Sequence, residues 1–150
     1  MDTILQTRNI VKKYHKRTVI NNINMNINKG DIYGFIGKNG AGKTTFMRVI
    51  LSLVPKDDGE VIYYDNKSIA DVGLKVGSLI ESPGLYKNAS AYENLKRFSV
   101  LYGADASKIN EILHMVGLEN NCKKAKNFSL GMKQRLGIAI ALLGDPELLI

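Results

Sequence analysis

A short apolar run followed by a cluster of glycines constrains this chain more than any other feature of its sequence. Residues 32–36 are nearly all apolar, and residues 37–44 read Gly-Lys-Asn-Gly-Ala-Gly-Lys-Thr. Apolar side chains then recur at helical spacing from Phe46 to Leu53, until Pro55 closes the segment. A buried strand, a glycine loop and a helix in this order predict an α/β fold with a parallel sheet.

The glycine cluster matches the phosphate-binding pattern G-x-x-x-x-G-K-[ST] at every fixed position. Glycines let such a loop turn its backbone N–H groups toward phosphate oxygens, and the dipole of the following helix favours the same anions. Lys43 is predicted to reach the β- and γ-phosphates, and Thr44 to ligate Mg²⁺. A chance match is the alternative, but the flanking strand and helix patterns disfavour it. The predicted nucleotide site comprises Gly37, Asn39, Gly40, Ala41, Gly42, Lys43, Thr44 and Thr45.

The rest of the chain alternates between strand and helix patterns. Ser90 and Glu93 have the spacing of a capping box at the start of one helix. The predicted strands are 5–11, 23–28, 60–64, 75–80 and 147–150, the predicted helices are 91–101, 106–116 and 131–143, and 119–127 is predicted to be a basic loop. Because 147–150 looks like the start of a buried strand, we expect the chain to be a fragment. An open sheet edge would then favour altered packing, association or disorder near the C-terminus.

Composition excludes several classes of protein. No apolar run is long enough to span a membrane, and the N-terminus lacks the pattern of a signal peptide. Cys122 is the only cysteine, so no disulfide can form within the chain and a reducing compartment is expected. The net charge of +7 is concentrated in residues 12–17 and 123–126. Such clusters suit an anionic partner or form a solvated basic face, and charge alone selects no function.

A second motif narrows the class of phosphate-binding protein. Residues 128–135 read Phe-Ser-Leu-Gly-Met-Lys-Gln-Arg. This segment resembles the signature of the ABC ATPases, usually Leu-Ser-Gly-Gly-Gln followed by x-Gln-Arg. It keeps Ser129, Gly131, Gln134 and Arg135 and departs at Phe128, Leu130 and Met132. A serine before a helix can be a simple cap, but this one stands between the phosphate loop and residues 148–150, which in the family open the Walker B strand. Residues 3–150 are identified as similar to this family.

The resemblance implies the fold class α/β, a P-loop NTPase of ABC type. Such a fold has an antiparallel β subdomain, a RecA-like parallel sheet core and a helical subdomain, here truncated before the Walker B carboxylates. Residues 1–150 would then be a partial nucleotide-binding domain. The expected divisions are 1–30 and 59–66 for the β subdomain, 31–58 and 67–81 for the P-loop core, 82–135 for the helical subdomain with the signature, and 136–150 for the return to the core.

The resemblance also implies how nucleotide is bound, with ATP and Mg²⁺ as the cofactors. Ser129 and Gly131 would bind the γ-phosphate held by a second copy, in a head-to-tail homodimer that sandwiches two ATP molecules. Tyr14 stands at the position of the aromatic residue that stacks on adenine, although it could also be a half-buried tyrosine at a strand end. Glu81 stands where the family has a glutamine that contacts the metal and the attacking water. An unrelated surface carboxylate is the alternative for Glu81.

The glutamate at this position resembles the bacitracin and lantibiotic-immunity subgroup, which exports antimicrobial peptides. The resemblance implies an ATP-binding subunit that couples ATP binding and hydrolysis to export. It would lie in the cytoplasm, peripheral on the inner face of the cell membrane, and dock through residues 82–92 on separate permease subunits. The family's catalytic glutamate and switch histidine are not in this sequence, and His15 and His114 do not have the switch position. We therefore expect no hydrolysis at a useful rate by these 150 residues.

Two other functions fit parts of the sequence. A non-transport ABC protein acting on the ribosome or on nucleic acid would suit the basic charge. The interval between Lys43 and Ser129 is too short for the coiled-coil insertion of the chromosome-maintenance members, and we expect no nucleic-acid partner. A P-loop kinase or GTPase outside the family would leave residues 129–135 unexplained.

Overall fold

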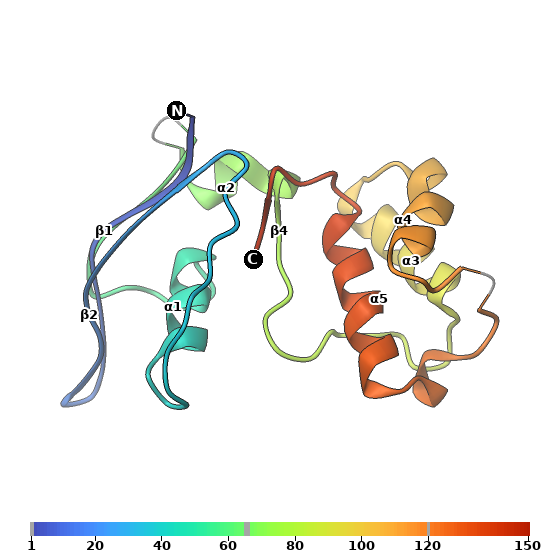
Figure 1. The fold of residues 1–150 in the computed structure, drawn as a ribbon, viewed down its shortest axis with the longest axis horizontal. Coiled ribbons are helices and arrows are strands. Elements are labelled where there is room, and N and C mark those ends of the chain that lie inside the picture. The colour runs from blue at the N-terminus through green and yellow to red at the C-terminus, as the bar shows by residue number, and fades with distance from the viewer. Residues whose placement is uncertain (1, 65–66, 120) are drawn as a thin grey trace. The chain divides into compact units, whose positions relative to one another are not determined.

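The computed structural model describes residues 2–64, 67–119 and 121–150, and the chain divides into two compact units (Figure 1). Unit 1 extends to Gly73, and unit 2 begins at Leu74. Parts of the predicted segments 1–30, 59–66 and 119–127 fall on residues 1, 65–66 and 120, which lie outside the described residues.

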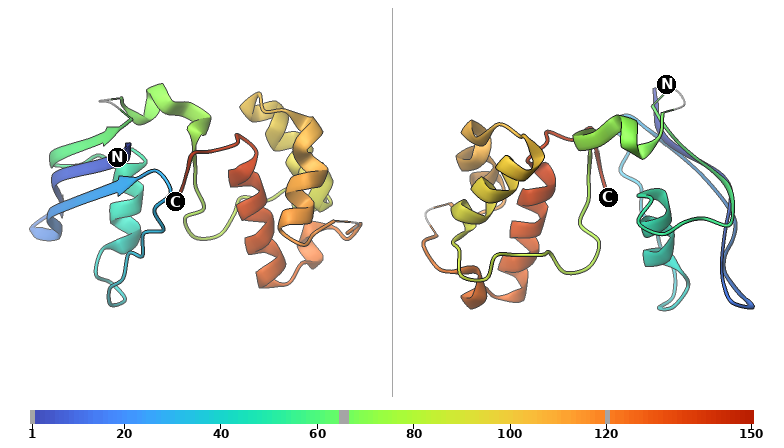
Figure 2. Two further views of the ribbon diagram at one scale, coloured as in Figure 1. Left: turned by 45° about the horizontal axis from the view of Figure 1, so that its top comes forward. Right: turned by 180° about the vertical axis from the view of Figure 1, so that it is seen from behind.

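Unit 1 is built on a three-stranded antiparallel sheet of order β2-β1-β3 (Figure 2). The strands are β1 (Thr3–Tyr14), β2 (Arg17–Asn28) and β3 (Asp58–Tyr63), which confirms the three predicted N-terminal strands. Alternating side chains such as Ile10 and Ile20 are buried, as expected for a sheet with one covered face. β1 and β2 form a longer hairpin than the sequence pattern indicated, because each strand carries irregular register shifts that break the alternation.

Helix α1 (Lys43–Ile50) follows the glycine loop and buries Phe46, Val49 and Ile50 in unit 1. It ends before Leu53, so the predicted extent of this helix was too long. Ser52 adopts a φ of +57°, and the backbone N–H of Leu53 turns back to the carbonyl of Arg48 at 2.9 Å. A left-handed residue after the last turn is a common helix terminator, and it leaves the Leu53 side chain 67% exposed. A short helix, α2 (Ile69–Val72), was not predicted.

The apolar run 32–36 is not a strand in this structure, and the prediction that it is buried in a parallel sheet is wrong here. The segment belongs to neither sheet, and Ile32 and Ile36 are almost fully exposed. The ring of Phe35 stacks on that of Phe46 with centroids 5.1 Å apart. A strand is defined by ladder hydrogen bonds to a neighbour, and the described residues of the sheet in unit 1 give this segment none.

Unit 2 contains a short parallel pair, β4 (Val76–Gly77) with β5 (Leu148–Leu149). The predicted strands 75–80 and 147–150 are therefore paired as expected but assigned over shorter lengths. Backbone bonds continue the pairing, from Leu79 N–H to the Ile150 carbonyl at 2.7 Å and from Ile150 N–H to the Gly77 carbonyl at 3.0 Å. A side chain at Gly77 would collide with the backbone of Ala141, so the pair is packed closely on a helix.

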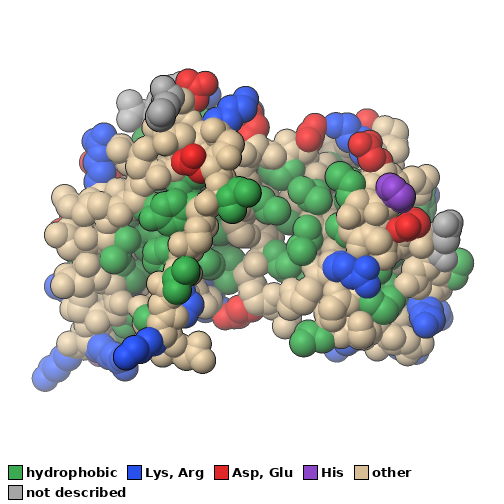
Figure 3. Space-filling view, in the orientation of Figure 1, with side chains coloured by type: hydrophobic (Ala, Val, Ile, Leu, Met, Phe, Trp, Pro, Cys, Tyr) green, Lys and Arg blue, Asp and Glu red, His purple; other side chains and the backbone are tan. Residues whose placement is uncertain are grey.

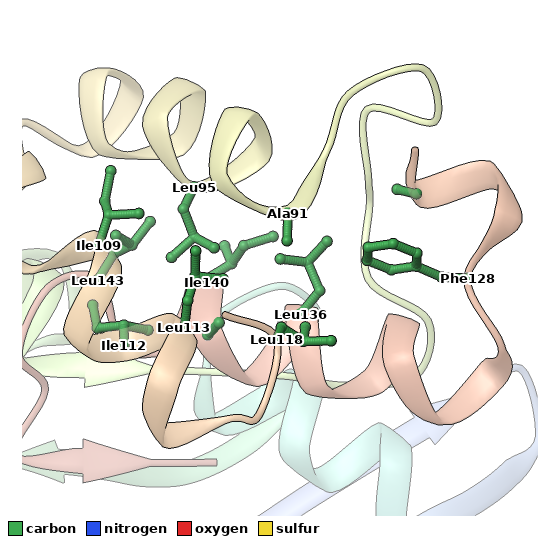
Figure 4. Close-up of a cluster of buried hydrophobic side chains, with 12 residues drawn as sticks. Ala91, Leu95, Ile109, Ile112, Leu113, Leu118, Phe128, Leu136, Ile140 and Leu143 are labelled. Atoms are coloured by element: carbon green, nitrogen blue, oxygen red, sulfur yellow. The ribbon is translucent and has the colours of Figure 1, made fainter. Parts of the chain in front are cut away.

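Three helices form the apolar centre of unit 2: α3 (Ala91–Tyr102), α4 (Ile109–Met115) and α5 (Leu130–Leu142). All three were predicted, although α4 is preceded by a 3₁₀ turn (Ala106–Lys108) rather than starting at residue 106. The predicted capping box is present, with Ser90 N–H donating to Glu93 at 2.7 Å and Glu93 N–H to Ser90 at 3.2 Å. Figure 4 shows side chains of the three helices meeting in one cluster, which includes Leu95, Ile109, Leu113, Leu136 and Ile140.

The hydroxyl of Tyr63 provides a test of the packing in unit 1. This side chain is 1% exposed, and its O–H donates to the Ile50 carbonyl at the end of α1 at 2.7 Å. Burial raises the pKa of the phenol, so it remains a donor at neutral pH. Tyr63→Phe should lower the free energy of unfolding in urea by about 1–2 kcal/mol, because a buried carbonyl loses its partner. Tyr33→Phe, at a half-exposed ring, is the control and should change it by less than about 0.5 kcal/mol.

Candidate nucleotide-binding site

The glycine loop leads directly into helix α1 and presents backbone amides at its start. Gly40 and Gly42 have φ angles of +80° and +93°, which other residues adopt only under strain. The carbonyl of Gly42 accepts the first helical bond, from Phe46 N–H at 2.8 Å, so this glycine caps the helix. The first turn of α1 has no acidic side chain, so the positive end of the helix is open to an anion.

The side chain of Lys43 closes the loop on itself. Its ammonium group donates to the carbonyl oxygens of Gly37 at 2.6 Å and Lys38 at 3.0 Å. The ammonium group is therefore held at the loop by two hydrogen bonds to neutral carbonyls, which a ligand could replace. Thr44 and Thr45 follow in the first turn of α1 and are partly exposed. This arrangement can receive an anion with several oxygens, which would replace the two carbonyls around the ammonium group.

The β1–β2 hairpin lies against the glycine loop. A Cβ atom added at Gly42 would stand 2.9 Å from the carbonyl oxygen of Val19, near the start of β2. Tyr14 ends β1 opposite Arg17, so it lies at the end of the hairpin where the turn joins β1 to β2. Figure 1 shows this turn and the glycine loop at the same end of unit 1. The ring is 45% exposed and available for contact. Unit 1 thus brings Tyr14 and the predicted phosphate-binding residues to one end.

An ion pair beside Tyr14, between a buried lysine and an exposed aspartate, was missed by the sequence analysis. Lys12 is 7% exposed, and its ammonium group lies 3.2 Å from a carboxylate oxygen of Asp57 and 5.3 Å from the centroid of the Tyr14 ring. The same oxygen accepts the backbone N–H of Lys13 at 2.6 Å. This hydrogen bond, and then the Lys12 ammonium, lower the pKa of Asp57. No local pattern could reveal the pair, because the partners are far apart in sequence and each stands among other charged residues.

Basic side chains gather around this end of unit 1. Figure 3 shows Lys and Arg atoms over the hairpin turn and the glycine loop. The exposed members of this patch are Lys13, Lys16, Arg17 and Lys38. The charge cluster at residues 12–17 therefore lies at the same end of unit 1 as the loop that the sequence predicts to bind phosphate, where it would raise the local concentration of an anion.

The other candidate residues belong to unit 2. Glu81 is exposed and has a φ of +69°, a conformation unusual for a glutamate, which the sequence did not indicate. Ser129 caps α5 by accepting the N–H of Met132 at 3.2 Å, and Gly131 has open space where a side chain would be. Both lie exposed in the N-terminal turn of α5. The structure therefore places these two at a helix start and Glu81 on a separate loop.

The predicted magnesium site needs few ligands from the protein itself. In residues 2–64, 67–119 and 121–150, no three Asp, Glu, His or Cys side chains gather into a group that could hold a metal ion. Mg²⁺ commonly takes only one or two protein ligands and completes its shell with water and phosphate oxygens. A single protein ligand, the hydroxyl of Thr44 at the end of the phosphate loop, would be enough for this mode of binding.

The chain matches a family model described as "ABC transporter" over residues 20–150. It is 49% identical over 148 residues to the lantibiotic transport ATP-binding protein SrtF of Streptococcus pyogenes, covering 98% of the chain and 65% of SrtF. It is 44% identical over 155 aligned positions to the bacitracin transport ATP-binding protein BcrA of Enterococcus faecalis, covering the whole chain and 50% of BcrA. The chain thus spans between half and about two thirds of these relatives.

Solved structures have the same fold. An ATP-binding cassette of an ABC transporter, MJ1267 in its ADP conformation, matches with a TM-score of 0.85 and 26% identity, over 99% of the chain and 68% of MJ1267. CbiO1 of Clostridium perfringens, part of the ABC transporter complex CbiONQ, matches with a TM-score of 0.83 and 25% identity, over 99% of the chain and 64% of CbiO1. The predicted fold class, with its antiparallel and parallel sheets, is confirmed.

The close contact at Gly42 predicts that substitution by alanine destabilises the protein more at Gly42 than at Gly40. Both Gly40 and Gly42 have positive φ, but a side chain at Gly40 would meet open space, whereas one at Gly42 would meet Val19. Gly42→Ala should therefore lower the free energy of unfolding by about 1–3 kcal/mol more than Gly40→Ala, as measured in urea. Equal losses in the two variants would mean that the hairpin does not contact the loop at this point.

The Asp57 carboxylate predicts a pH dependence. Its pKa is lower in the folded than in the unfolded protein, so its stabilising effect is present above the unfolded value and is lost as pH falls through the folded value. Asp57→Asn should be less stable than the wild type at neutral pH, and the difference should shrink only below about pH 4. Urea titrations of both proteins between pH 7 and 2 measure this difference. A difference that grows on acidification would contradict the assignment.

Proposed function

The chain belongs to the ABC transporter family, and on this premise we propose that the complete protein is the ATP-binding subunit of an exporter. It would couple ATP binding and hydrolysis, in a dimer that sandwiches nucleotide, to transport by a membrane partner. The single observation that carries the proposal is the geometry of residues 37–44. Two left-handed glycines, an uncompensated helix start and an inward-facing lysine together form a site for a polyphosphate.

The phosphate-binding residues have distinct roles in this proposal. The ammonium group of Lys43 would exchange its two loop carbonyls for β- and γ-phosphate oxygens. Backbone amides of the loop and of the first turn of α1 would bind the remaining oxygens, and the amide of Ala41 would first give up its bond to the Lys38 carbonyl. Thr44 would ligate Mg²⁺, and Glu81 would contact the metal or the attacking water. Bound Mg²⁺ would neutralise phosphate charge during transfer.

Tyr14 would stack on the adenine ring of ATP. Its exposed face supports this role, and the contact of Val19 with Gly42 keeps its strand end close to the loop. Lys12 lies within cation–π distance of the same ring, held there by Asp57. Stacking of this kind provides affinity with little selectivity among bases. The basic patch around the loop would favour the approach of the triphosphate.

Ser129 and Gly131 would complete the site of a second copy. Both are exposed in the N-terminal turn of α5, and a helix start with a hydroxyl and an unhindered backbone suits a terminal phosphate. In the proposed head-to-tail homodimer, each copy donates this turn to the nucleotide held by the other. We keep the subdomain divisions 1–30 with 59–66, 31–58 with 67–81, 82–135 and 136–150 as part of this proposal.

The partners and the substrate follow from the relatives. SrtF and BcrA are named for transport of a lantibiotic and of bacitracin, and we propose an antimicrobial peptide as the exported substrate. Separate permease subunits would dock on residues 82–92, which places the protein on the cytoplasmic face of the membrane. Among the described residues, no helix has the length and apolar character needed to cross a bilayer. Nothing in the relatives supports the alternative of action on ribosomes or nucleic acid.

Substitution of Lys43 tests the proposed function. In the complete protein, Lys43→Ala should weaken ATP binding roughly ten- to a hundredfold, because charge-assisted bonds to the phosphates are lost. It should also abolish the ATP-driven formation of a dimer. Fluorescence of a labelled ATP analogue measures the first effect, and light scattering during gel filtration measures the second.

Lys29→Ala is the matched control, since Lys29 is an exposed lysine in a turn of the same unit. This variant should bind ATP and dimerise as the wild type does. The proposed function is wrong if the complete wild-type protein binds ATP no better than Lys43→Ala does.

A further inference from the structure

A fully buried asparagine organises a loop in unit 2, and the nucleotide chemistry proposed above gives it no role. Asn94 lies in the first turn of α3 and is 0% exposed. Its Oδ1 atom accepts the backbone N–H of Tyr86 at 2.8 Å. Its Nδ2 atom donates to the carbonyls of Ser90 at 2.8 Å, Tyr86 at 3.2 Å and Ala89 at 3.3 Å. One side chain therefore fixes both ends of the loop 86–90.

The surroundings leave the carboxamide of Asn94 one orientation. A single N–H group faces Oδ1, and three carbonyl oxygens face Nδ2, so a rotated amide would place donor against donor and acceptor against acceptors. A buried polar group is costly unless it is fully paired, and here every polar atom of the side chain has a partner. The shape of residues 86–90 is thus tied to the identity of this residue.

The loop that Asn94 holds is bonded in turn to the segment before α5. The backbone N–H of Ala125 donates to the Ala89 carbonyl, and that of Lys126 donates to the Lys87 carbonyl, both at 2.8 Å. Ala89 and Ala125 are 2% and 1% exposed, so the first of these bonds is shielded from water. The bonded segment includes the 3₁₀ turn Ala125–Asn127 and runs into Phe128, which is buried in the helical cluster. The next residue is Ser129.

We infer that Asn94 is a positioning residue for Ser129: by fixing residues 86–90 it holds residues 125–128, and so sets where the start of α5 presents its hydroxyl. The inference rests on the proposed function, in which Ser129 meets the nucleotide of a second copy and residues 82–92 receive the permease. The same two backbone bonds then connect the docking loop to the signature serine.

The test uses the complete protein with Asn94→Asp, which has nearly the same shape but replaces Nδ2 by an oxygen that faces three carbonyls. Hydrogen exchange at the amides of Ala125 and Lys126 should become about tenfold faster or more, because their acceptors are released. The dissociation constant of the ATP-driven dimer should rise about tenfold or more. ATP affinity at the phosphate loop, measured with a fluorescent analogue, should stay within about twofold, since Lys43 and its neighbours are unchanged.

Asn110→Asp is the matched control, because it makes the same chemical change at an exposed position on α4. It should leave exchange at residues 125 and 126 and dimer formation unchanged. Ala125→Pro is a second variant that removes one N–H donor from the bonded pair. Lys124 is extended and Ala125 begins a helical turn, which is where proline is tolerated. It should weaken the dimer and retain ATP binding and the slow exchange of α5.

The outcomes separate this inference from the proposed function. If the complete wild-type protein forms no dimer with ATP, the proposed function fails, whereas faster exchange at Ala125 and Lys126 in Asn94→Asp would still support the structural link. If the wild type dimerises and Asn94→Asp dimerises equally well, the positioning role is overturned. A general loss of exchange protection, in α5 as well as in residues 125–126, together with lost ATP binding, would also overturn it, because Asn94 would then only support the fold.

Discussion

The approach of Gly42 to the backbone of Val19 is the contact on which the arrangement of unit 1 depends. A glycine with left-handed φ both starts α1 and admits the β1–β2 hairpin to within van der Waals distance of the loop. The loop alone could bind phosphate anywhere on a surface. Contact with the hairpin adds a ring, Tyr14, and an ion pair, Lys12 with Asp57, at a fixed side of that loop. In the proposed function, the base of a nucleotide would lie on this side of the loop, against Tyr14.

Most of the secondary structure could be predicted because it is determined locally. The alternation at residues 23–28 of β2, the capping box at Ser90 and the helical spacing in α3 and α5 each depend on side chains a few residues apart. The run 32–36 shows where such reasoning ends. Its apolar composition is typical of a buried strand, yet strand formation requires a neighbouring ladder, which lies elsewhere in the sequence. The early end of α1 has a similar origin, because Ser52 adopts left-handed φ without being a glycine.

The residues of the candidate site also differ in how far the sequence could predict them. The loop 37–44 is one continuous segment, so its pattern could be recognised without knowledge of the fold. The pairing of Lys12 with Asp57 joins β1 to the residue before β3 and has no signature in either segment. The bonds from Ala125 and Lys126 to residues 87 and 89 are between backbone atoms and could be made by almost any residue, so the sequence carries no trace of them. Asn94 is a sequence-specific part of this arrangement, because its side chain holds the loop 86–90 that accepts these bonds.

The hydrogen bonds that Lys43 already makes affect how a ligand would bind to the loop. Its ammonium group already has two oxygen partners, and Gly40 and Gly42 set the loop backbone in a left-handed conformation just before α1. A triphosphate would substitute oxygens of greater negative charge for neutral carbonyls, so it gains strength from charge without first having to order the loop. The absence of an acidic side chain from the first turn of α1 prevents competition for the same amides. Affinity then depends on electrostatics in a preformed site, and the cost in conformational entropy is already met by folding.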